Sequence, residues 1–201
     1  MNAIPGRLER SMTALAFWVG YSHAKFGWHH LPEGAAVAEF WSLMDARLGP
    51  DEALLPEVAY SRLEGKAGKQ VVLTGEHVDM AVVNRIALEL DDHASIKQHV
   101  NVIIEVKRWG AAQKLVDGDV DRLATSLRLL PRTARAFVIV VSERDRPSRY
   151  LTAKNLAKKG VMSTRAGSMY RVRRVVKALS TAAPGSKSGH YVCLLEVMRP
   201  S

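Results

Sequence analysis

The sequence predicts an α/β fold in which a mixed central sheet is flanked by helices. Two features of its 201 residues support this class. Apolar runs rich in β-branched residues, which are typical of strands, share the chain with stretches whose apolar residues recur at helical spacing. One helical stretch lies between two of these strands, which predicts a right-handed crossover between parallel neighbours. With this parallel pair, the sheet should be mixed.

Two helices are expected before the first strand. Apolar residues step along the first at helical spacing: Leu8, Met12, Leu15 and Val19. The second uses one apolar face: Val37, Phe40, Trp41, Met44 and Leu48. Gly49 and Pro50 follow it and are typical helix stop signals. The first apolar stretch is too short to cross a bilayer, so we interpret it as a helix of the folded protein.

The middle of the chain should be rich in strands. Three are predicted: Val58–Leu63, His77–Asn84 and Val100–Lys107. Gly65–Lys69 reads as a turn, and Val71–Leu73 continues the apolar pattern.

A long amphipathic helix should follow, ended by Pro131. Its apolar residues step by four, three, four and three: Val116, Val120, Leu123, Leu127 and Leu130. Asp117 or Asp119 is a candidate N-cap. Phe137–Val141 is then a continuous apolar run, which favours a strand covered on both faces.

Two further helices, Thr152–Lys159 and Ser168–Leu179, and a last strand, Tyr191–Val197, are expected at the carboxyl end. The whole chain, 1–201, is predicted to be one domain. Its core would span about 35–142, with a basic helical segment at 144–180 and a final strand at 190–197 packed against it.

The charge is unevenly distributed. The chain carries 29 Lys and Arg against 20 Asp and Glu, a net charge of +9. Eleven of the basic residues lie between Arg144 and Lys177, where the only acid is Asp145. A concentrated positive field attracts polyanions, which makes nucleic acid the leading partner. The single cysteine, Cys193, excludes an intrachain disulfide and favours a reducing, cytoplasmic compartment.

Three charged residues stand within or at the end of apolar strands: Asp79, Glu105 and Lys107. Side chains alternate along a strand, so Glu105 and Lys107 should project from the same face. Such charges are costly to bury unless they are paired or bind a metal ion. Mg²⁺ or Mn²⁺ would suit the two carboxylates, and the amine would hold or help deprotonate the attacking water. This is an arrangement that can cleave phosphodiesters.

The order of these motifs resembles the PD-(D/E)xK nuclease superfamily, which has the restriction-endonuclease-like fold. The likeness covers roughly Ala35 to Ser142: a helix, a strand, a strand with Asp79, a strand ending in Glu105-Val106-Lys107, an amphipathic helix and a final strand. It implies that Asp79, Glu105 and the carbonyl of Val106 bind the metal and that Lys107 is catalytic. The residue before Asp79 is Val78 rather than the family's proline. The triplet Glu64-Gly65-Lys66 also fits the short motif but has no strand around it.

Other residues are auxiliary candidates. The resemblance implies a further glutamate, for which Glu57 ranks ahead of Glu39, and His77 shares the expected face of Asp79. Three other acids could replace Asp79: Glu89, Asp91 and Asp92. The cations expected to bind nucleic acid lie in the basic segment: Arg149, Lys154, Lys158, Lys159, Arg165, Arg171, Arg174 and Lys177.

The expected function is therefore a metal-dependent endonuclease or exonuclease acting on nucleic acid, with DNA as the first choice and no membrane partner. The alternative is a nucleic-acid-binding or assembly subunit with the same fold and no turnover. A protein-interaction partner that docks on an acidic surface is a third reading, and a homodimer is compatible with all of them.

Overall fold

The computed structural model describes residues 5–26, 31–64, 76–90, 95–110, 113–143, 145–179 and 189–200. The helices are α1 (Gly6–Phe26), α2 (Glu33–Asp45), α3 (Tyr60–Glu64) and α4 (Gln113–Leu127), with short 3₁₀ helices η1 (Arg85–Glu89) and η2 (Lys97–His99). The strands are β1 (Glu52–Ala59), β2 (His77–Asn84), β3 (Val100–Arg108), β4 (Arg135–Ser142), β5 (Met162–Ser163), β6 (Met169–Leu179) and β7 (Gly189–Val197). The described strands form one sheet in the order β1-β2-β3-β4-β7-β6-β5.

The sheet is mixed, as the sequence predicts. β3 and β4 run parallel, joined by α4, and the other neighbouring pairs are antiparallel. A parallel pair needs a crossover, and the amphipathic α4 provides it. The α/β class is thereby confirmed, together with the crossover helix.

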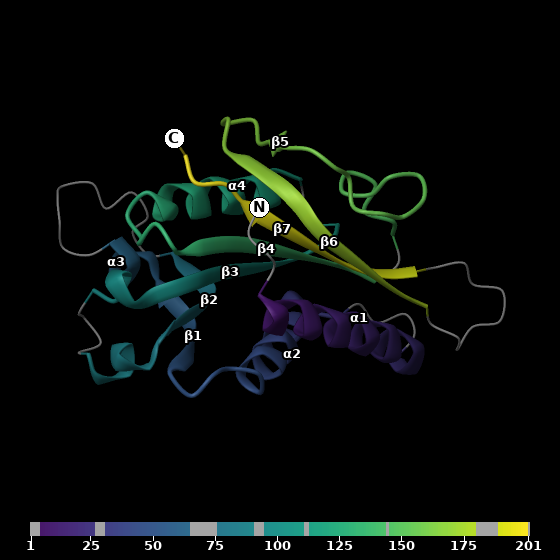
Figure 1. The fold of residues 1–201 in the computed structure, drawn as a ribbon. Coiled ribbons are helices and arrows are strands. Elements are labelled where there is room, and N and C mark those ends of the chain that lie inside the picture. Colours follow the sequence, from purple (N-terminus) through teal and green to yellow (C-terminus); the bar gives the residue numbers. More distant parts are fainter. Residues whose placement is uncertain are drawn as a thin grey trace.

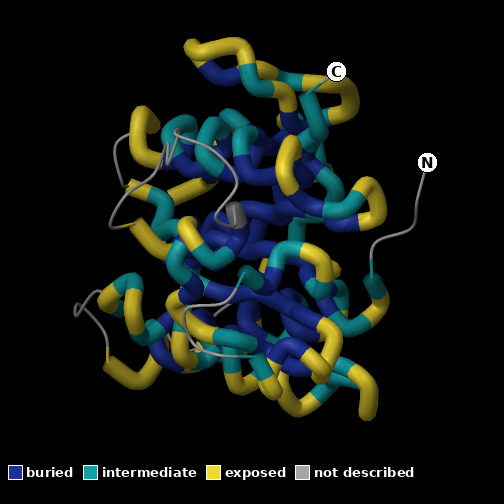
Figure 2. The backbone as a smooth tube through the Cα atoms, turned by 90° about the vertical axis from the view of Figure 1, so that its left-hand side faces the viewer, coloured by how far each residue is buried: buried dark blue, intermediate teal, exposed yellow. Residues whose placement is uncertain are grey.

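Helices cover both faces of the sheet (Figure 1). α1 and α2 lie on one face, where Leu15 and Phe40 are fully buried against Val82, Ile104 and other strand residues. α4 lies on the opposite face and buries Val120 and Leu123. Buried residues accordingly fill the middle of the molecule, and exposed ones lie mainly at its rim (Figure 2). No helix of the described ranges is long and apolar enough to cross a membrane.

The first predicted strand is displaced. β1 spans Glu52–Ala59, and the chain turns into α3 at Tyr60, so Val58–Leu63 is not one strand. Tyr60 and Leu63 are fully buried, so the apolar run that predicts a strand here belongs to the core as part of a helix. The predicted turn at Gly65–Lys69 and the stretch Val71–Leu73 lie outside the described residues.

The predicted carboxyl-terminal basic helices are wrong. Met169–Leu179 is strand β6, which pairs with β7 and shifts register between Val172 and Arg174. Val172 packs in the core on the α4 side, as does Val175 after the shift. A bulge therefore changes the phase of the two-residue alternation and leaves apolar residues at spacings that imitate a helix. The basic segment thus completes the sheet instead of forming a helical appendage.

The segment predicted as a helix at Thr152–Lys159 is also irregular. Leu151 and Ala157 form an isolated bridge, and the amide of Thr152 donates to the carbonyl of Leu156 at 2.8 Å. Asn155 has φ of 60°, a left-handed conformation that interrupts a right-handed helix and that asparagine tolerates. In this segment, tertiary contacts and the local turn outweigh the helix propensity of the alanines and lysines.

Candidate functional site

Asp79 and Glu105 lie side by side where β2 and β3 separate. The paired register of the two strands ends at Met80 and Ile104. One residue beyond it, the Asp79 carboxylate accepts a hydrogen bond from the backbone amide of Val106 at 2.7 Å. The Asp79 carboxylate thus takes the place of the next hydrogen-bond acceptor between the two strands. It lies next to Glu105 on the α4 side of the sheet. The two acids that the sequence predicts as neighbours are brought together.

Glu105 is deeply buried. Only 2% of its surface is exposed, and its Oε1 accepts a hydrogen bond from the Tyr60 hydroxyl at 2.8 Å. Burial raises the pKa of Glu105 to about 8, and the nearby charges of Asp79 and Asp119 add to the effect. Lys107 and the Tyr60 hydrogen bond act in the opposite direction. The carboxyl group therefore binds a proton more tightly than an ordinary glutamate does, even with Lys107 nearby.

Lys107 lies among carboxylates. Its Nζ is 3.1 Å from Glu33 Oε1, 3.6 Å from Asp119 Oδ2 and 3.9 Å from Glu105 Oε2. Burial would lower the pKa of Lys107, but the surrounding acids, first Asp119 and then Glu105, outweigh it and raise the pKa. The amine therefore stays charged at neutral pH. The exposed fraction of the side chain increases from Glu105 to Lys107 and is highest, at 40%, for Glu33. The site therefore reaches solvent on the side where Glu33 lies.

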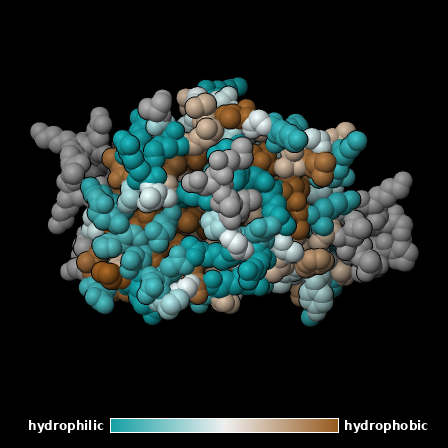
Figure 3. All heavy atoms as spheres, viewed as in Figure 1, coloured by the Kyte–Doolittle hydropathy of each residue, from teal (hydrophilic) through white to brown (hydrophobic). Residues whose placement is uncertain are grey.

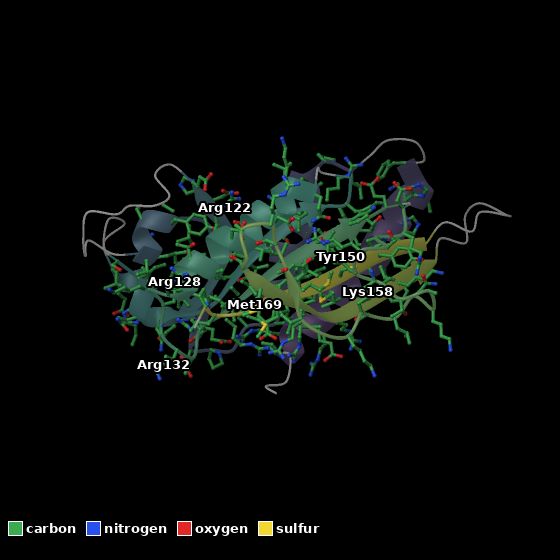
Figure 4. All side chains as sticks on the ribbon, turned by 90° about the horizontal axis from the view of Figure 1, so that it is seen from above. Arg122, Arg128, Arg132, Tyr150, Lys158 and Met169 are labelled. Atoms are coloured by element: carbon green, nitrogen blue, oxygen red, sulfur yellow. The ribbon has the colours of Figure 1, made fainter. Side chains whose placement is uncertain are left out.

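α4 contributes an acid and a base to the same cluster. Asp119 is fully buried and pairs with Arg122, whose Nε lies 3.3 Å from Glu76 Oε2. Burial raises the pKa of Asp119 to about 6, while Lys107 and Arg122 lower it. Among the described residues, the Oδ2 atom of Asp119 has no hydrogen-bond partner. It is the oxygen that lies 3.6 Å from Lys107 Nζ. In the view from above, Arg122 lies beside α4 (Figure 4).

The predicted site lacks the residues that surround the triad of Asp79, Glu105 and Lys107. Asp119 was considered as an N-cap, but α4 begins at Gln113 and Asp119 is in its interior. A signal was available: Asp119 falls three residues after Val116 and four before Leu123, on the apolar face of the helix. Glu33 and Tyr60 carry no comparable pattern, because only the fold brings them to the end of β3.

The auxiliary candidates lie apart from this cluster. Glu57 is exposed at the β1 edge with φ of 48°, and His77 is exposed at the start of β2. Glu39 is on α2, on the opposite face of the sheet. No contact among the described residues joins any of the three to Glu105 or Lys107. Glu89 is exposed in η1, and Asp91 and Asp92 lie outside the described residues.

Several predicted nucleic-acid contacts are already paired with acids. Arg149 Nη2 is 2.9 Å from Asp117 Oδ1, Arg171 Nε is 3.1 Å from Glu196 Oε2, and Arg174 pairs with Glu9. The other candidates form no ion pair with the described residues and are exposed or half-buried: Lys154, Lys158, Lys159, Arg165 and Lys177. Four of these five cations, Lys154, Lys158, Lys159 and Arg165, lie outside regular helices and strands. The molecular surface seen from the viewpoint of Figure 1 is largely hydrophilic (Figure 3).

Two carboxylates and an adjacent backbone carbonyl, at Asp79, Glu105 and Val106, match what Mg²⁺ takes from proteins, with water completing its shell. Within the described ranges, no three His, Cys, Asp or Glu side chains are grouped to hold a metal ion. Any ion would thus depend on two acidic side chains. Comparison with protein-family models, curated proteins and solved structures finds no match to this chain.

Proposed function

We propose that this protein is a metal-dependent nuclease that hydrolyses phosphodiester bonds of nucleic acid, with DNA as the expected substrate. One observation carries the proposal: Asp79 and Glu105 stand together at the separating ends of two strands, and Lys107 Nζ lies 3.9 Å from Glu105. Buried carboxylates with an amine beside them are costly and cluster at functional sites. The likeness in motif order to the PD-(D/E)xK superfamily supports the same reading.

Asp79 and Glu105 would hold the metal ion, Mg²⁺ or Mn²⁺, with the carbonyl of Val106. A bound ion of this kind polarises a phosphoryl oxygen and lowers the pKa of bound water. Tyr60 orients Glu105 by its hydrogen bond at 2.8 Å, and the amide of Val106 orients Asp79. These contacts hold the two acids in place before any ligand arrives, which limits the reorganisation needed.

Lys107 would stabilise charge rather than remove a proton. Its raised pKa keeps the amine cationic at neutral pH. A cation beside the reacting phosphate offsets the negative charge that builds up in the transition state. Glu33 and Asp119 hold the amine from two sides, at 3.1 and 3.6 Å, and so act as positioning residues.

The test is cleavage of plasmid, single-stranded DNA and RNA by the purified protein with Mg²⁺ or with EDTA. We expect cleavage with Mg²⁺ only. Lys107→Ala should lower the rate by about 10²–10³-fold, the usual effect of removing one group that stabilises charge in the transition state, while affinity measured in EDTA changes little. Lys25→Ala, which removes an exposed lysine of α1, is the matched control and should cleave normally. Full activity of Lys107→Ala would refute the assignment.

A binding protein without turnover is the second candidate. It is favoured by the ion pairs that already surround the Lys107 amine and by the absence of a three-residue metal cluster among the described residues. Salt-sensitive binding of nucleic acid, with no cleavage under any metal tested, would identify this case.

A further inference from the structure

A basic groove runs along the open side of β6. It has a volume of about 590 Å³, within the range of ligand sites. It is lined by two stretches of chain: Leu156, Ala157, Lys158, Lys159 and Gly160 on one side, and Arg171, Val172 and Arg173 on the other. Four of these residues are cationic and none is acidic. We call this feature the basic groove.

The lysine side of the groove is fixed by backbone hydrogen bonds. The amide of Lys158 donates to the carbonyl of Tyr150 at 2.9 Å, and Leu151 and Ala157 form a bridge. Tyr150 is fully buried, so the turn is anchored in the core. Tyr150 and Lys158 lie over the part of the molecule that contains β6 and β7 (Figure 4). The two lysines are therefore presented by an ordered turn and not by a free chain.

The arginine side of the groove is held by a shared carboxylate. Arg171 and Arg173 contact Glu196 at 3.1 and 2.9 Å, and Arg135 contacts the same carboxylate at 2.7 Å. One carboxylate thus orients three guanidinium groups. A guanidinium has five donors, and with the described residues Arg171 uses only Nε, for Glu196, so its terminal nitrogens can donate to a ligand.

We propose that the basic groove binds the phosphodiester backbone of a nucleic-acid strand, as a second contact separate from the Asp79–Glu105–Lys107 site. This inference rests on the proposed function, because it names where the substrate strand is held. β6 is three strand positions from β3, roughly 14 Å at the usual sheet spacing, so the two sites contact different parts of a strand.

The groove suits a strand better than a flat anionic surface. It is concave, and its cations come from two separate stretches of chain. Leu156, 64% exposed, adds an apolar contact of the kind a sugar or base can cover. Phosphate contacts of this type supply affinity and position without reading sequence.

The experiment measures binding of a fluorescein-labelled oligodeoxythymidine by anisotropy in EDTA, which separates binding from cleavage. Lys158→Ser with Lys159→Ser is the test variant. Lys25→Ser with Arg85→Ser is the control, because it removes the same charge from exposed positions on α1 and η1, outside the groove. Unfolding curves of both variants check that the fold is retained.

We expect the groove variant to make the negative slope of log K against log salt shallower by about 1.4, the value for two single-strand phosphate contacts. The change in affinity between about 50 and 200 mM salt then shrinks roughly sevenfold relative to wild type. The control should keep the wild-type slope. This result would stand even if no metal-dependent cleavage were found, so the two proposals fail separately.

Three outcomes would overturn the inference. One is equal slopes for the groove variant and the control, and another is absence of oligonucleotide binding by the wild-type chain. The third is binding to vesicles of anionic lipid without binding to the oligonucleotide, which would make the groove a membrane contact.

Discussion

Glu105 and Asp119 are buried where ionisation is unfavourable. Their pKa values rise to about 8 and about 6, in each case first because of burial. A raised pKa means that the folded chain binds the proton more tightly than the unfolded chain does. The contribution of each group to the free energy of unfolding is therefore complete below its ordinary pKa. It is lost as pH rises through the pKa of the group in the folded chain. The fold retains these acids at a cost in stability, as functional sites often do.

Glu105→Gln should make stability less dependent on pH. The amide does not titrate, so the loss that Glu105 causes between about pH 4.5 and 8 should disappear. Relative to wild type, we expect the variant to gain on the order of 3 kcal/mol between about pH 5 and pH 9. Urea unfolding in EDTA at both pH values measures this. Glu57→Gln, which removes an exposed carboxylate, is the control, and an equal gain in both variants would argue against the assignment.

At the scale of elements, α1 packs closely on β7 through a glycine. A Cβ at Gly20 would lie 3.3 Å from Cδ2 of His190, so only glycine lets the helix approach this ring without displacement. His190 is fully buried, and its ring lies 4.8 Å from that of His23. Burial lowers the pKa of His190, and His23 adds to this, while Glu143 opposes it. The contact between helix and strand therefore depends on a neutral imidazole.

Acid should weaken this contact. Because the folded pKa of His190 lies below its ordinary value of 6.5, the unfolded chain takes up the proton first. The contribution is complete above pH 6.5 and is lost as pH falls through the folded pKa. Unfolding midpoints between about pH 7 and pH 5 should thus fall more steeply for wild type than for His190→Leu. His77→Leu, at an exposed position, should behave like wild type; parallel curves for all three proteins would contradict the prediction.

α2 shows how the two sides of the sheet meet at the site. Its first residue, Glu33, accepts hydrogen bonds from Lys107 Nζ and from the backbone amide of Arg108, both at 3.1 Å. These hydrogen bonds connect the start of α2, on one face of the sheet, to the end of β3, which carries Lys107. Neither the helix nor the strand contains a local signal for this contact.

At the scale of the whole molecule, one sheet separates two hydrophobic layers. Leu15 is buried between α1 and the sheet, whereas α4 buries Leu123 on the opposite face. Strands such as β3 contribute alternate residues to both layers, Ile103 to one and Ile104 to the other. Because each strand is shared, we expect the layers to unfold together as a single unit.

Leu15→Ala should test this cooperativity. Removing a fully buried leucine is expected to cost about 2–5 kcal/mol, whereas Phe17→Ala, at a residue 64% exposed on the same helix, should change stability by about 0.5 kcal/mol or less. Hydrogen exchange then reports on each layer. In Leu15→Ala, slowly exchanging amides of α4 should accelerate as much as those of α1. Acceleration confined to α1 would show that the layers open independently.

The sequence by itself determined the α/β class, the crossover at α4, the strands that carry Asp79, Glu105 and Lys107, and the location of the positive charge. These follow from local periodicity and composition, which a chain carries without its fold. Only the tertiary structure decided that the basic segment is a strand, because pairing with β7 and a bulge outweighed local helical spacing. It also decided that Tyr60, Glu33 and Asp119 gather around the triad. Contacts between residues 45, 74 and 12 positions apart arise from chain packing; local periodicity places Asp119 on the apolar face of its helix but does not give its partner.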